Sequence, residues 1–498
     1  MTPPSSQRFD RIIIVGGGSA GWMTAAALAT EFKGRRSVEV VESEEIGIVG
    51  VGEATFPSIR SYNQLVGIDE AEFLRATNGS YKLGIRFCDW LEVGKDYFHT
   101  FGHFGNLFGS QTLWAQHRRL GLSEPLGVQC LPTVMAMRGR FVLPQDDSQF
   151  KYAYHFDAVA YAAYLRRLAT QRGARHTQGR IVDVLRRPDG DVAAVQLDDG
   201  RRIEGDLFID CSGFRSLLLG KTLEEPFVDF SHWLPVDGAW ACPCERSGEE
   251  LTPYTTATAL EGGWAWRIPL QNRTGHGHVF SSRFIDVDRA REQLLARLDG
   301  KPLAEPRLLR FTTGHRQRFW VNNVIAIGLS SGFLEPLEST SIYLIQDGIA
   351  RLMAMLTEGQ PPDDDARALF NEGSARRFAR IRDFIILHYC LTRRRDSELW
   401  RHVASMELPE TLAFRLDLWR DSSLLHEYDD EGFDATSWLA IHAGMDNWPR
   451  REDPVFAEVP PERALHALRA RRDTLAAWVD RQPPHHRLLQ HVLTAPAR

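Results

Sequence analysis

The sequence of 498 residues has few cysteines: its six are too sparse for a disulfide scaffold. Cys242 and Cys244 are separated by one proline, but no second ligand pair is near them in the sequence, which favours thiols over a zinc site. An uninterrupted apolar stretch of about 18 residues, as a membrane-spanning helix needs, is also missing. The polar N-terminus, Met1 to Asp10, has no signal-peptide core, so we expect a cytoplasmic protein.

An excess of positive charge is missing as well. Lys and Arg number 59 and Asp and Glu 65, so the formal net charge is −6. The basic triplet at 393–395 is followed at once by Asp396, which is typical of a solvated helix face. A nucleic-acid partner is therefore disfavoured.

What the sequence does contain near its start is a dinucleotide-binding pattern. An apolar run enters Gly16-x-Gly18-x-x-Gly21, and a helix-favouring stretch comes next. The first glycine permits a tight turn, the second lets a pyrophosphate approach the backbone, and the third lets helix pack on strand. The helix N-terminus adds free N–H groups for phosphates. We expect Ser19 and Ala20, inside the turn, to belong to the same site.

Later strands indicate which dinucleotide binds. Glu42 ends a predicted strand at 37–41, about 20 residues past the glycines, where an acid that binds a ribose belongs. Further buried strands are expected at 207–210 and 324–327, with a sheet segment inserted between them. This discontinuous order is typical of two-domain flavin monooxygenases, so FAD is favoured over NAD. The sequence has one such glycine motif, hence no evident second site for NAD(P)H.

The predicted fold is therefore α/β. We expect a Rossmann-like FAD-binding module of the two-domain monooxygenase type over residues 1–360, with a substrate sheet inserted at about 216–320. A mostly helical region over 361–498 is expected to cover the substrate.

Three further motifs give the sequence a resemblance to a known family. Trp264–Pro269 reads Trp-Ala-Trp-Arg-Ile-Pro and matches a WxWxIP signature. Gly328–Ile342 is similar to a segment that runs from an FAD pocket to an active site, and Ser80–Ile85 resembles the stretch around a catalytic lysine. Supporting matches are Val51–Pro57 and Asp210–Arg215. With these motifs the sequence resembles the flavin-dependent halogenases of the tryptophan-halogenase type.

The resemblance implies a reaction. In the family, reduced FAD and O2 convert a bound chloride or bromide to hypohalous acid, which a tunnel leads to a lysine, here Lys82. Backbone N–H groups after a Glu-Ser pair hold the halide, which maps onto Thr340 and Ser341, with Ser341 at a position where glycine is common. Glu338 would stabilise and deprotonate the cationic ring intermediate.

The resemblance also implies contacts for cofactor and substrate. The resemblance places His99 and Phe101 against the substrate ring, but packing in the core explains these two side chains equally well. Core packing explains Trp264 and Trp266 equally well too. The expected residues are, for FAD, Gly16, Gly18, Ser19, Ala20, Gly21, Glu42, Ala54, Ile181, Leu329 and Ile342, and, for the substrate, His99, Phe101 and Phe433.

The substrate expectation depends on a lid motif. Tryptophan-specific members grip the amino acid's charged groups with aromatic and polar residues; here the corresponding stretch, 431–445, has Phe433 where they place a tryptophan, and lacks their tyrosine pair. Without that clamp we expect indole or an indole derivative rather than free tryptophan, in a wide and exposed pocket. A separate NAD(P)H-dependent flavin reductase would supply FADH2, and we consider a homodimer among the assemblies.

Two alternatives stay open. A flavin-dependent aromatic hydroxylase or epoxidase begins with the same oxygen chemistry but needs neither halide nor Lys82, and the WxWxIP motif argues against it. A protein that binds FAD without turnover, as a sensor or scaffold, is disfavoured by the joint presence of lysine, glutamate and the segment between FAD pocket and active site.

Overall fold

The computed structural model describes residues 9–43, 53–105, 107, 112–356, 363–451 and 457–495. The chain divides into two compact units, each built from three separate stretches. The first unit comprises Met1–Asn78, Phe156–Ser231 and Phe311–Phe378, and the second comprises Gly79–His155, His232–Arg310 and Ala379–Arg498.

This division crosses the boundary that we expected at residue 360. The inserted sheet and the helical C-terminal region belong to one unit instead of two. Hydrophobic periodicity marks where strands and helices lie along the chain, but the pairing of strands that are distant in sequence decides which stretches form one body.

The first unit holds the Rossmann-like part. Its described strands are β1 (Arg11–Val15), β2 (Ser37–Glu42), β3 (Glu53–Ala54), β8 (Arg175–Gln178), β9 (Ile181–Arg186), β10 (Val192–Leu197), β11 (Arg202–Glu204), β12 (Leu207–Asp210), β13 (Phe227–Asp229), β19 (Gly314–Arg316), β20 (Trp320–Val321), β21 (Val324–Ala326) and β22 (Gly332–Phe333). Its helices are α1 (Ser19–Phe32), α2 (Ser58–Leu65), α3 (Glu70–Ala76), α6 (Ala158–Gln171), α8 (Ser341–Leu356) and the first part of α9 (Asp364–Cys390), with short turns η3 (Gly213–Arg215), η4 (Leu217–Thr222), η5 (Gly328–Ser330) and η6 (Pro336–Glu338).

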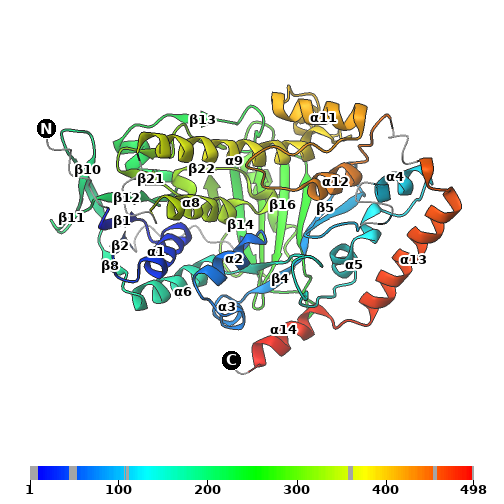
Figure 1. Cartoon of the computed structure of the whole chain (residues 1–498), viewed down its shortest axis with the longest axis horizontal. Helices are drawn as coiled ribbons and strands as arrows, with labels where there is room; N and C mark the ends of the chain where they lie inside the picture. The colour runs from blue at the N-terminus through cyan, green and yellow to red at the C-terminus, as the bar shows by residue number, and fades with distance from the viewer. Residues whose placement is uncertain are drawn as a thin grey trace. The chain divides into compact units, whose positions relative to one another are not determined.

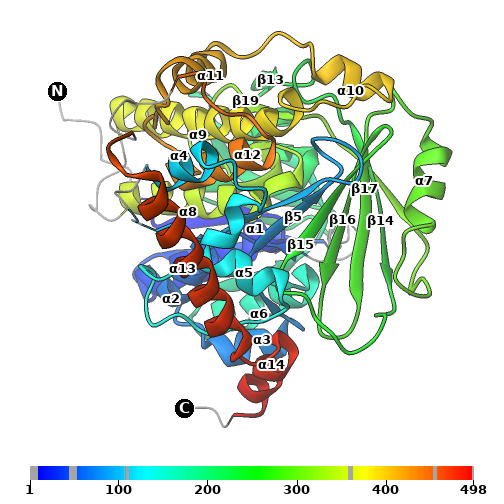
Figure 2. The same cartoon turned by 90° about the vertical axis from the view of Figure 1, so that its right-hand side faces the viewer.

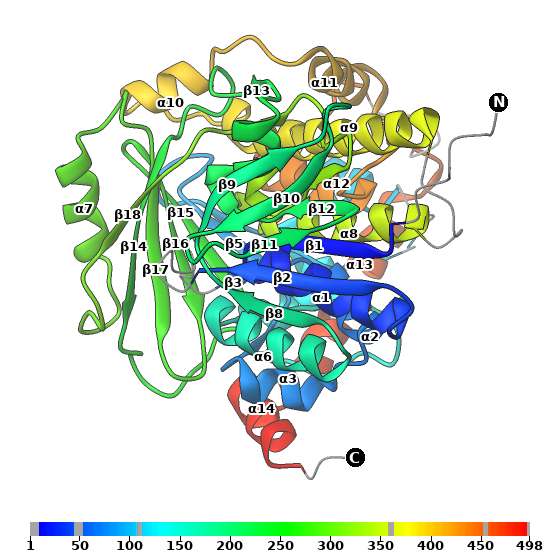
Figure 3. The same ribbon diagram turned by 90° about the vertical axis from the view of Figure 1, so that its left-hand side faces the viewer.

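A six-stranded sheet of order β20-β21-β12-β1-β2-β8 forms the centre of this unit. The pairs of β1 with β12 and β2, of β12 with β21 and of β2 with β8 are parallel, and Figure 3 shows β12, β1, β2 and β8 side by side, with α1 and α6 beside them. The strands predicted at 37–41, 207–210 and 324–327 are confirmed. Because parallel strands end at one edge, Val15, Asp210 and Ala326 bring their following loops together there.

The second unit holds the larger sheet and most of the C-terminal helices. Its described strands are β4 (Ser80–Lys82), β5 (Gly84–Cys88), β6 (Asp96–Thr100), β7 (Ala153–Phe156, whose last residue falls in the first unit), β14 (Gly238–Cys244), β15 (Thr255–Leu260), β16 (Gly263–Pro269), β17 (Thr274–Phe280) and β18 (Arg307–Arg310). Its helices are α4 (Thr112–Arg119), α5 (Leu131–Met137), α7 (Val287–Leu295), α10 (Glu398–Val403), α11 (Glu410–Ser422), α12 (Ala435–Gly444), α13 (Pro461–Asp480) and α14 (His485–Thr494), with the short turn η2 (Leu126–Gln129).

A seven-stranded sheet of order β18-β14-β17-β16-β15-β5-β6 organises this unit. Figure 2 shows these strands as a fan with α7 along one side. The pairing of β5 with β15 is parallel and the others are antiparallel. Figure 1 shows α13 and α14 in orange and red; α13 contacts α4 and α5, and α14 contacts β4.

The two tryptophans of the WxWxIP motif lie on β16 and are buried, with ring centroids 6.2 Å apart. Trp266 pairs across the strands with Gly277, and a Cβ atom at Gly277 would collide with the indole ring. Core packing therefore accounts for both side chains, and the glycine on β17 is needed to make room for one of them.

Two further features concern the described residues as a set. None of the helices in the described ranges has the length and hydropathy to span a bilayer. All six cysteines are free thiols, and burial raises the pKa of Cys242 and of Cys244.

We predict that Gly277→Ala lowers the free energy of unfolding by about 1–3 kcal/mol, because the added methyl group overpacks the Trp266 ring. Urea denaturation measures the change. In a Trp266→Leu background the same substitution should cost distinctly less. Equal costs in both backgrounds would show that the ring is not what excludes a side chain at Gly277.

Candidate active site

The glycine turn after β1 has the geometry that its motif predicts. Gly16 has a φ of +114°, which favours glycine, and a Cβ atom there would collide with the carbonyl oxygen of Cys211. A Cβ at Gly21 would collide with the carbonyl of Gly16, so the third glycine permits the close contact between helix and turn. A Cβ at Gly18, the N-cap of α1, would meet no described atom within 4 Å. The space that a pyrophosphate needs is therefore open at the second glycine.

The middle residue of the glycine triplet has a role that sequence analysis missed. A Cβ atom at Gly17 would overlap the carboxylate of Glu42, which ends β2. The Glu42 carboxylate lies 2.7 Å from Nε2 of His176 and 3.7 Å from Arg166. Glycine at 17 thus leaves room for the predicted ribose-binding acid, which lies beside two basic side chains.

The loops after β12 and β21 meet the glycine turn at the same sheet edge. The buried carboxylate of Asp210 accepts hydrogen bonds from the backbone N–H groups of Ser212, Leu218 and Leu219, at 2.8–3.0 Å. Gly328, with a φ of +81°, starts η5, and a Cβ atom there would crowd the Cβ of Ala20. The predicted FAD residues on α1 and in η5, which are more than 300 positions apart in sequence, are thereby neighbours.

Three other predicted FAD residues have less distinctive surroundings. Ala54, on the short strand β3, is buried, and so is Ile342 in the first turn of α8. Ile181 packs against the apolar cluster that includes Val195 and Leu197. Beside Ala54, partial burial raises the pKa of Glu53 to about 7.

The predicted halide segment is a sharp corner. Ser339, between η6 and α8, has a φ of +60°, in the left-handed region. Thr340 is buried, and its hydroxyl oxygen has no hydrogen-bond partner within the described part of the chain. The first N–H groups of a helix have no hydrogen-bond partner inside that helix. Such groups stand at the start of α8, directly after this corner. Glu338, in η6, is 2% exposed.

Lys82 lies in the second unit, fully buried on β4. Its ammonium nitrogen is 5.3 Å from the ring centroid of Phe101. The neighbouring Tyr81 points to the opposite face of the strand, where its ring stacks on Phe141 at 4.3 Å. A surface position, the usual one for lysine, is thereby excluded for Lys82.

The three predicted substrate residues form one aromatic cluster in the same unit as Lys82. The ring of His99 lies 6.5 Å from that of Phe101 and 6.0 Å from that of Phe433. Phe433 stacks on Phe384 at 3.9 Å, a contact that sequence analysis missed. His99 and Phe433 are 1% and 2% exposed, which differs from the exposed pocket that we expected.

The segment that carries Phe433 is held by a buried cation. The guanidinium of Arg415 lies between the rings of Tyr428 and Trp438, at 4.6 and 4.2 Å, and forms an ion pair with Glu431. Burial lowers the pKa of Arg415 and raises that of Glu431. The ion pair and the two ring contacts together tie α11 to this segment.

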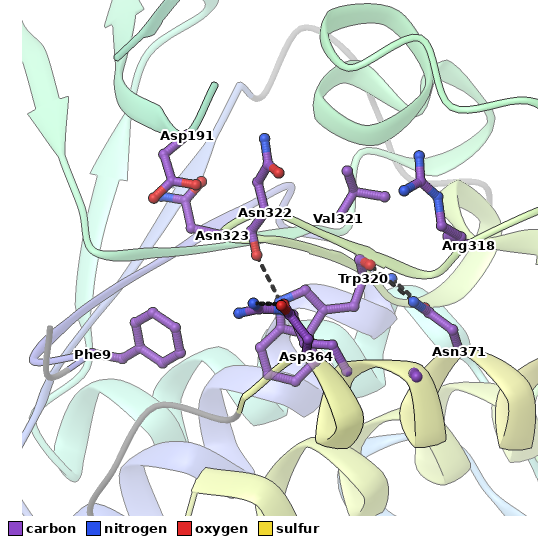
Figure 4. A pocket seen from close by; sticks show the side chains of 11 residues that line it. Phe9, Asp191, Arg318, Trp320, Val321, Asn322, Asn323, Asp364 and Asn371 are labelled. Atoms are coloured by element: carbon purple, nitrogen blue, oxygen red, sulfur yellow. Dashed lines mark hydrogen bonds and ion pairs between the residues drawn. The ribbon is translucent and has the colours of Figure 1, made fainter. Parts of the chain in front are cut away.

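A hollow of about 480 Å³ lies elsewhere in the first unit, at the edge where the parallel strands begin (Figure 4). Several polar groups around it are committed to the fold. The amide of Asn371 binds the backbone of Phe319 and Trp320, and Arg318 pairs with the buried Glu225 at 2.7 Å. The glycine turn lies at the opposite ends of these strands, so the hollow is not part of the predicted site.

Comparison with known proteins identifies the family. The sequence profile described as tryptophan halogenase matches residues 11–461. The chain belongs to this family. A flavin-dependent halogenase from Xanthomonas campestris, Xcc4156, has 44% sequence identity and a TM-score of 0.94, over 99% of this chain and 100% of that one.

Two more relatives agree with this assignment. BrvH, a flavin-dependent halogenase from Brevundimonas sp. BAL3, has 42% identity and a TM-score of 0.93, over 97% of this chain and 99% of that one. The tryptophan 6-halogenase SttH from Streptomyces toxytricini is 35% identical over 95% of this chain and 96% of its own.

Membership in the tryptophan halogenase family confirms three predictions. The resemblance was correct, the fold is the α/β fold of flavin-dependent halogenases, and the protein is an enzyme. Within the halogenase, the residues predicted for FAD and halide, together with Glu338, belong to the first unit. Lys82, His99, Phe101 and Phe433 belong to the second.

We predict that Arg415→Met lowers the free energy of unfolding of this halogenase by about 1–3 kcal/mol, because it removes the closest cation from Glu431, whose side chain is 12% exposed, and leaves only Arg380 at 3.9 Å. Urea denaturation measures the loss. The double variant Arg415→Met/Glu431→Gln is the matched control and should recover a large part of it. If the double variant is as unstable as Arg415→Met, lost ring contacts and not the ion pair explain the effect.

Proposed function

We propose that this halogenase uses FADH2, O2 and chloride or bromide to halogenate an electron-rich aromatic ring, an indole or an indole derivative in preference to free tryptophan. FADH2 comes from a separate NAD(P)H-dependent flavin reductase. The observation that carries the proposal is Lys82, an amine fully buried on β4 against the ring of Phe101, in a chain of the halogenase family.

The glycine turn fits FAD. Gly18 leaves open space at the N-terminus of α1, and the first N–H groups of that helix suit a pyrophosphate. Glu42 would accept hydrogen bonds from the ribose. When bound, FADH2 would supply two of the four electrons that O2 takes up and the halide would supply the other two, so that one oxygen atom ends in hypohalous acid and the other in water. The residues proposed to hold it are Gly16, Gly18, Ser19, Ala20, Gly21, Glu42, Ala54, Ile181, Leu329 and Ile342.

Thr340 and Ser341 hold the halide in this proposal. Backbone N–H groups at the start of α8 provide partial positive charge without a proton that titrates. The left-handed Ser339 turns the chain so that these groups lead the helix. Burial of Thr340 keeps this end of the site dry, which strengthens the attraction for an anion.

Lys82 and Glu338 act after the oxidant has formed. The Lys82 amine either donates a hydrogen bond to hypohalous acid or carries the halogen as a haloamine, and both roles deliver the halogen at one point. Attack by the aromatic ring produces a cation, which the Glu338 carboxylate stabilises and from which it takes the proton. Two polar groups thus divide delivery and deprotonation between them.

The aromatic cluster of His99, Phe101 and Phe433 supports the substrate proposal. Flat rings favour a flat aromatic substrate, and burial of a ring discriminates weakly between related compounds. SttH is named for tryptophan, but the tyrosine pair of tryptophan-specific enzymes is absent from this chain's 431–445 stretch. A ring without the amino acid's charged groups therefore fits this chain better.

We predict that Lys82→Ala lowers the rate of product formation at least about 100-fold while FAD binding and halide oxidation persist, because the lysine acts after the oxidant forms. The assay supplies FAD, a reductase, NADH, bromide and indole, and measures haloindole, free hypohalous acid and FAD fluorescence.

Glu338→Gln should also slow product formation, on the order of 100-fold, since an amide cannot accept the ring proton.

Omission of the reductase is the control, and no haloindole should form without it. Hydroxylated indole in place of haloindole would favour the hydroxylase alternative. A near-normal rate in Lys82→Ala would remove the lysine from the mechanism.

We predict that kcat/KM for indole exceeds that for free tryptophan by at least about tenfold, because no clamp for the ammonium and carboxylate groups compensates for their desolvation. Initial rates with both compounds under identical halide and flavin supply measure the ratio. A higher kcat/KM for tryptophan would refute the substrate proposal and leave the halogenase assignment intact.

A further inference from the structure

A chain of buried hydrogen bonds joins the strand of Lys82 to the end of the WxWxIP strand. The hydroxyl of Ser80 donates to the carbonyl oxygen of Pro269 at 3.0 Å. Nδ1 of His155 lies 3.2 Å from the same hydroxyl oxygen, and Nε2 lies 2.9 Å from Oγ1 of Thr255. Ser80 and His155 are fully buried, and Thr255 is 5% exposed.

The direction of each hydrogen bond is set by the donors present. The one hydroxyl proton of Ser80 goes to the Pro269 carbonyl, which can only accept. Ser80 Oγ must then accept from Nδ1–H of His155. A neutral imidazole protonated at Nδ1 has a bare Nε2, which accepts from the hydroxyl of Thr255. These hydrogen bonds therefore run from Thr255 through His155 and Ser80 to Pro269, and each of their protons has one position. We call this series of hydrogen bonds the relay.

This relay lies on the same face of the strands as Lys82. In the antiparallel pair of β4 and β7, Ser80 is opposite His155 and Lys82 is opposite Ala153. Side chains alternate along a strand, so Ser80, Lys82 and His155 share one face. Because Ala153 has only a small side chain, the imidazole of His155 is the nearest large side chain on β7 that shares a face with Lys82.

The charge state of His155 agrees with this arrangement. Burial, and then the nearby positive charges of Lys82 and Arg267, hold the pKa of His155 well below its usual range. At neutral pH the imidazole therefore stays uncharged and adds no positive charge beside the Lys82 amine.

We propose that His155, acting through Ser80, is a positioning residue for Lys82. The relay fastens β4 to the carbonyl of Pro269 and thereby sets the place from which the amine meets the oxidant. This inference rests on the proposed role of Lys82. A displacement of about 1 Å can cost on the order of 100-fold in rate, so a loosened β4 should lose delivery of the halogen without losing its formation.

The experiment compares His155→Phe, His155→Asn and Ser80→Ala with the wild type in the bromide and indole assay. We expect His155→Phe to lower kcat, and haloindole formed per FADH2 oxidised, at least about tenfold, with KM for indole within about twofold. Escaped hypohalous acid, measured with a β-diketone trap, should rise in proportion. His155→Asn keeps an N–H donor for Ser80 and should recover most of the yield.

Ser80→Ala tests whether the two residues act as one unit. It should match His155→Phe, and the double variant should be no worse than either single variant. A loss in the double variant equal to the product of the two single losses would overturn the relay, and so would failure of His155→Asn to recover the yield.

His278→Phe is the matched control for a merely structural effect. His278 is another fully buried histidine of the second unit, and its Nδ1–H donates to the carbonyl of Ala290 at 2.9 Å. We expect this variant to lose stability in urea as His155→Phe does, but to keep its haloindole yield per FADH2. Parallel losses of yield and stability in both variants would show that His155 has a structural role only.

The tautomer of His155 is measured independently of catalysis. Nitrogen-15 NMR of the histidine side chains in the wild type should show His155 neutral and protonated at Nδ1 between about pH 6 and 8. This is the range in which a histidine ordinarily titrates. A titration in that range, or a proton on Nε2, would overturn the relay. Wild-type enzyme that forms no haloindole would instead refute the proposed function, whereas normal yield in His155→Phe would refute this inference alone.

Discussion

Burial of the Lys82 amine is the constraint on which the second unit depends. A lysine removed from water is unfavourable unless its surroundings compensate, and a strand of three residues has few contacts of its own. Both faces of β4 are therefore held. The Tyr81 ring stacks on Phe141, its backbone N–H donates to Nε2 of His485 on α14 at 3.3 Å, and Ser80 is fastened to Pro269.

The first unit meets a different constraint, which is the close approach of backbone segments at one sheet edge. Gly16, Gly21 and Gly328 each stand where a Cβ atom would collide with another segment. The Asp210 carboxylate holds the loop after β12 by accepting backbone N–H groups. Room for a cofactor exists because glycine omits side chains at these contacts and leaves Gly18 uncovered.

The aromatic cluster proposed for substrate recognition is backed by packing and by a buried cation. Phe433 was expected from a motif comparison, and the structure buries it against Phe384. Arg415 is held between two rings, and this fixes the segment from which Phe433 projects. The position of the Phe433 ring therefore depends also on residues that support its segment through packing and do not contact it directly.

The sequence by itself determined the local features: the glycine turn, Glu42 at the end of its strand, the buried strands at 207–210 and 324–327, and the halogenase resemblance. These features depend on short-range rules of turn geometry and hydrophobic periodicity. Only the tertiary structure decided that residues 84–100 join the sheet of residues 238–310, that Ser80 meets Pro269 and His155, and that His155 in turn meets Thr255. Such contacts join residues 75 to 189 positions apart, and no local pattern records which distant strands will pair.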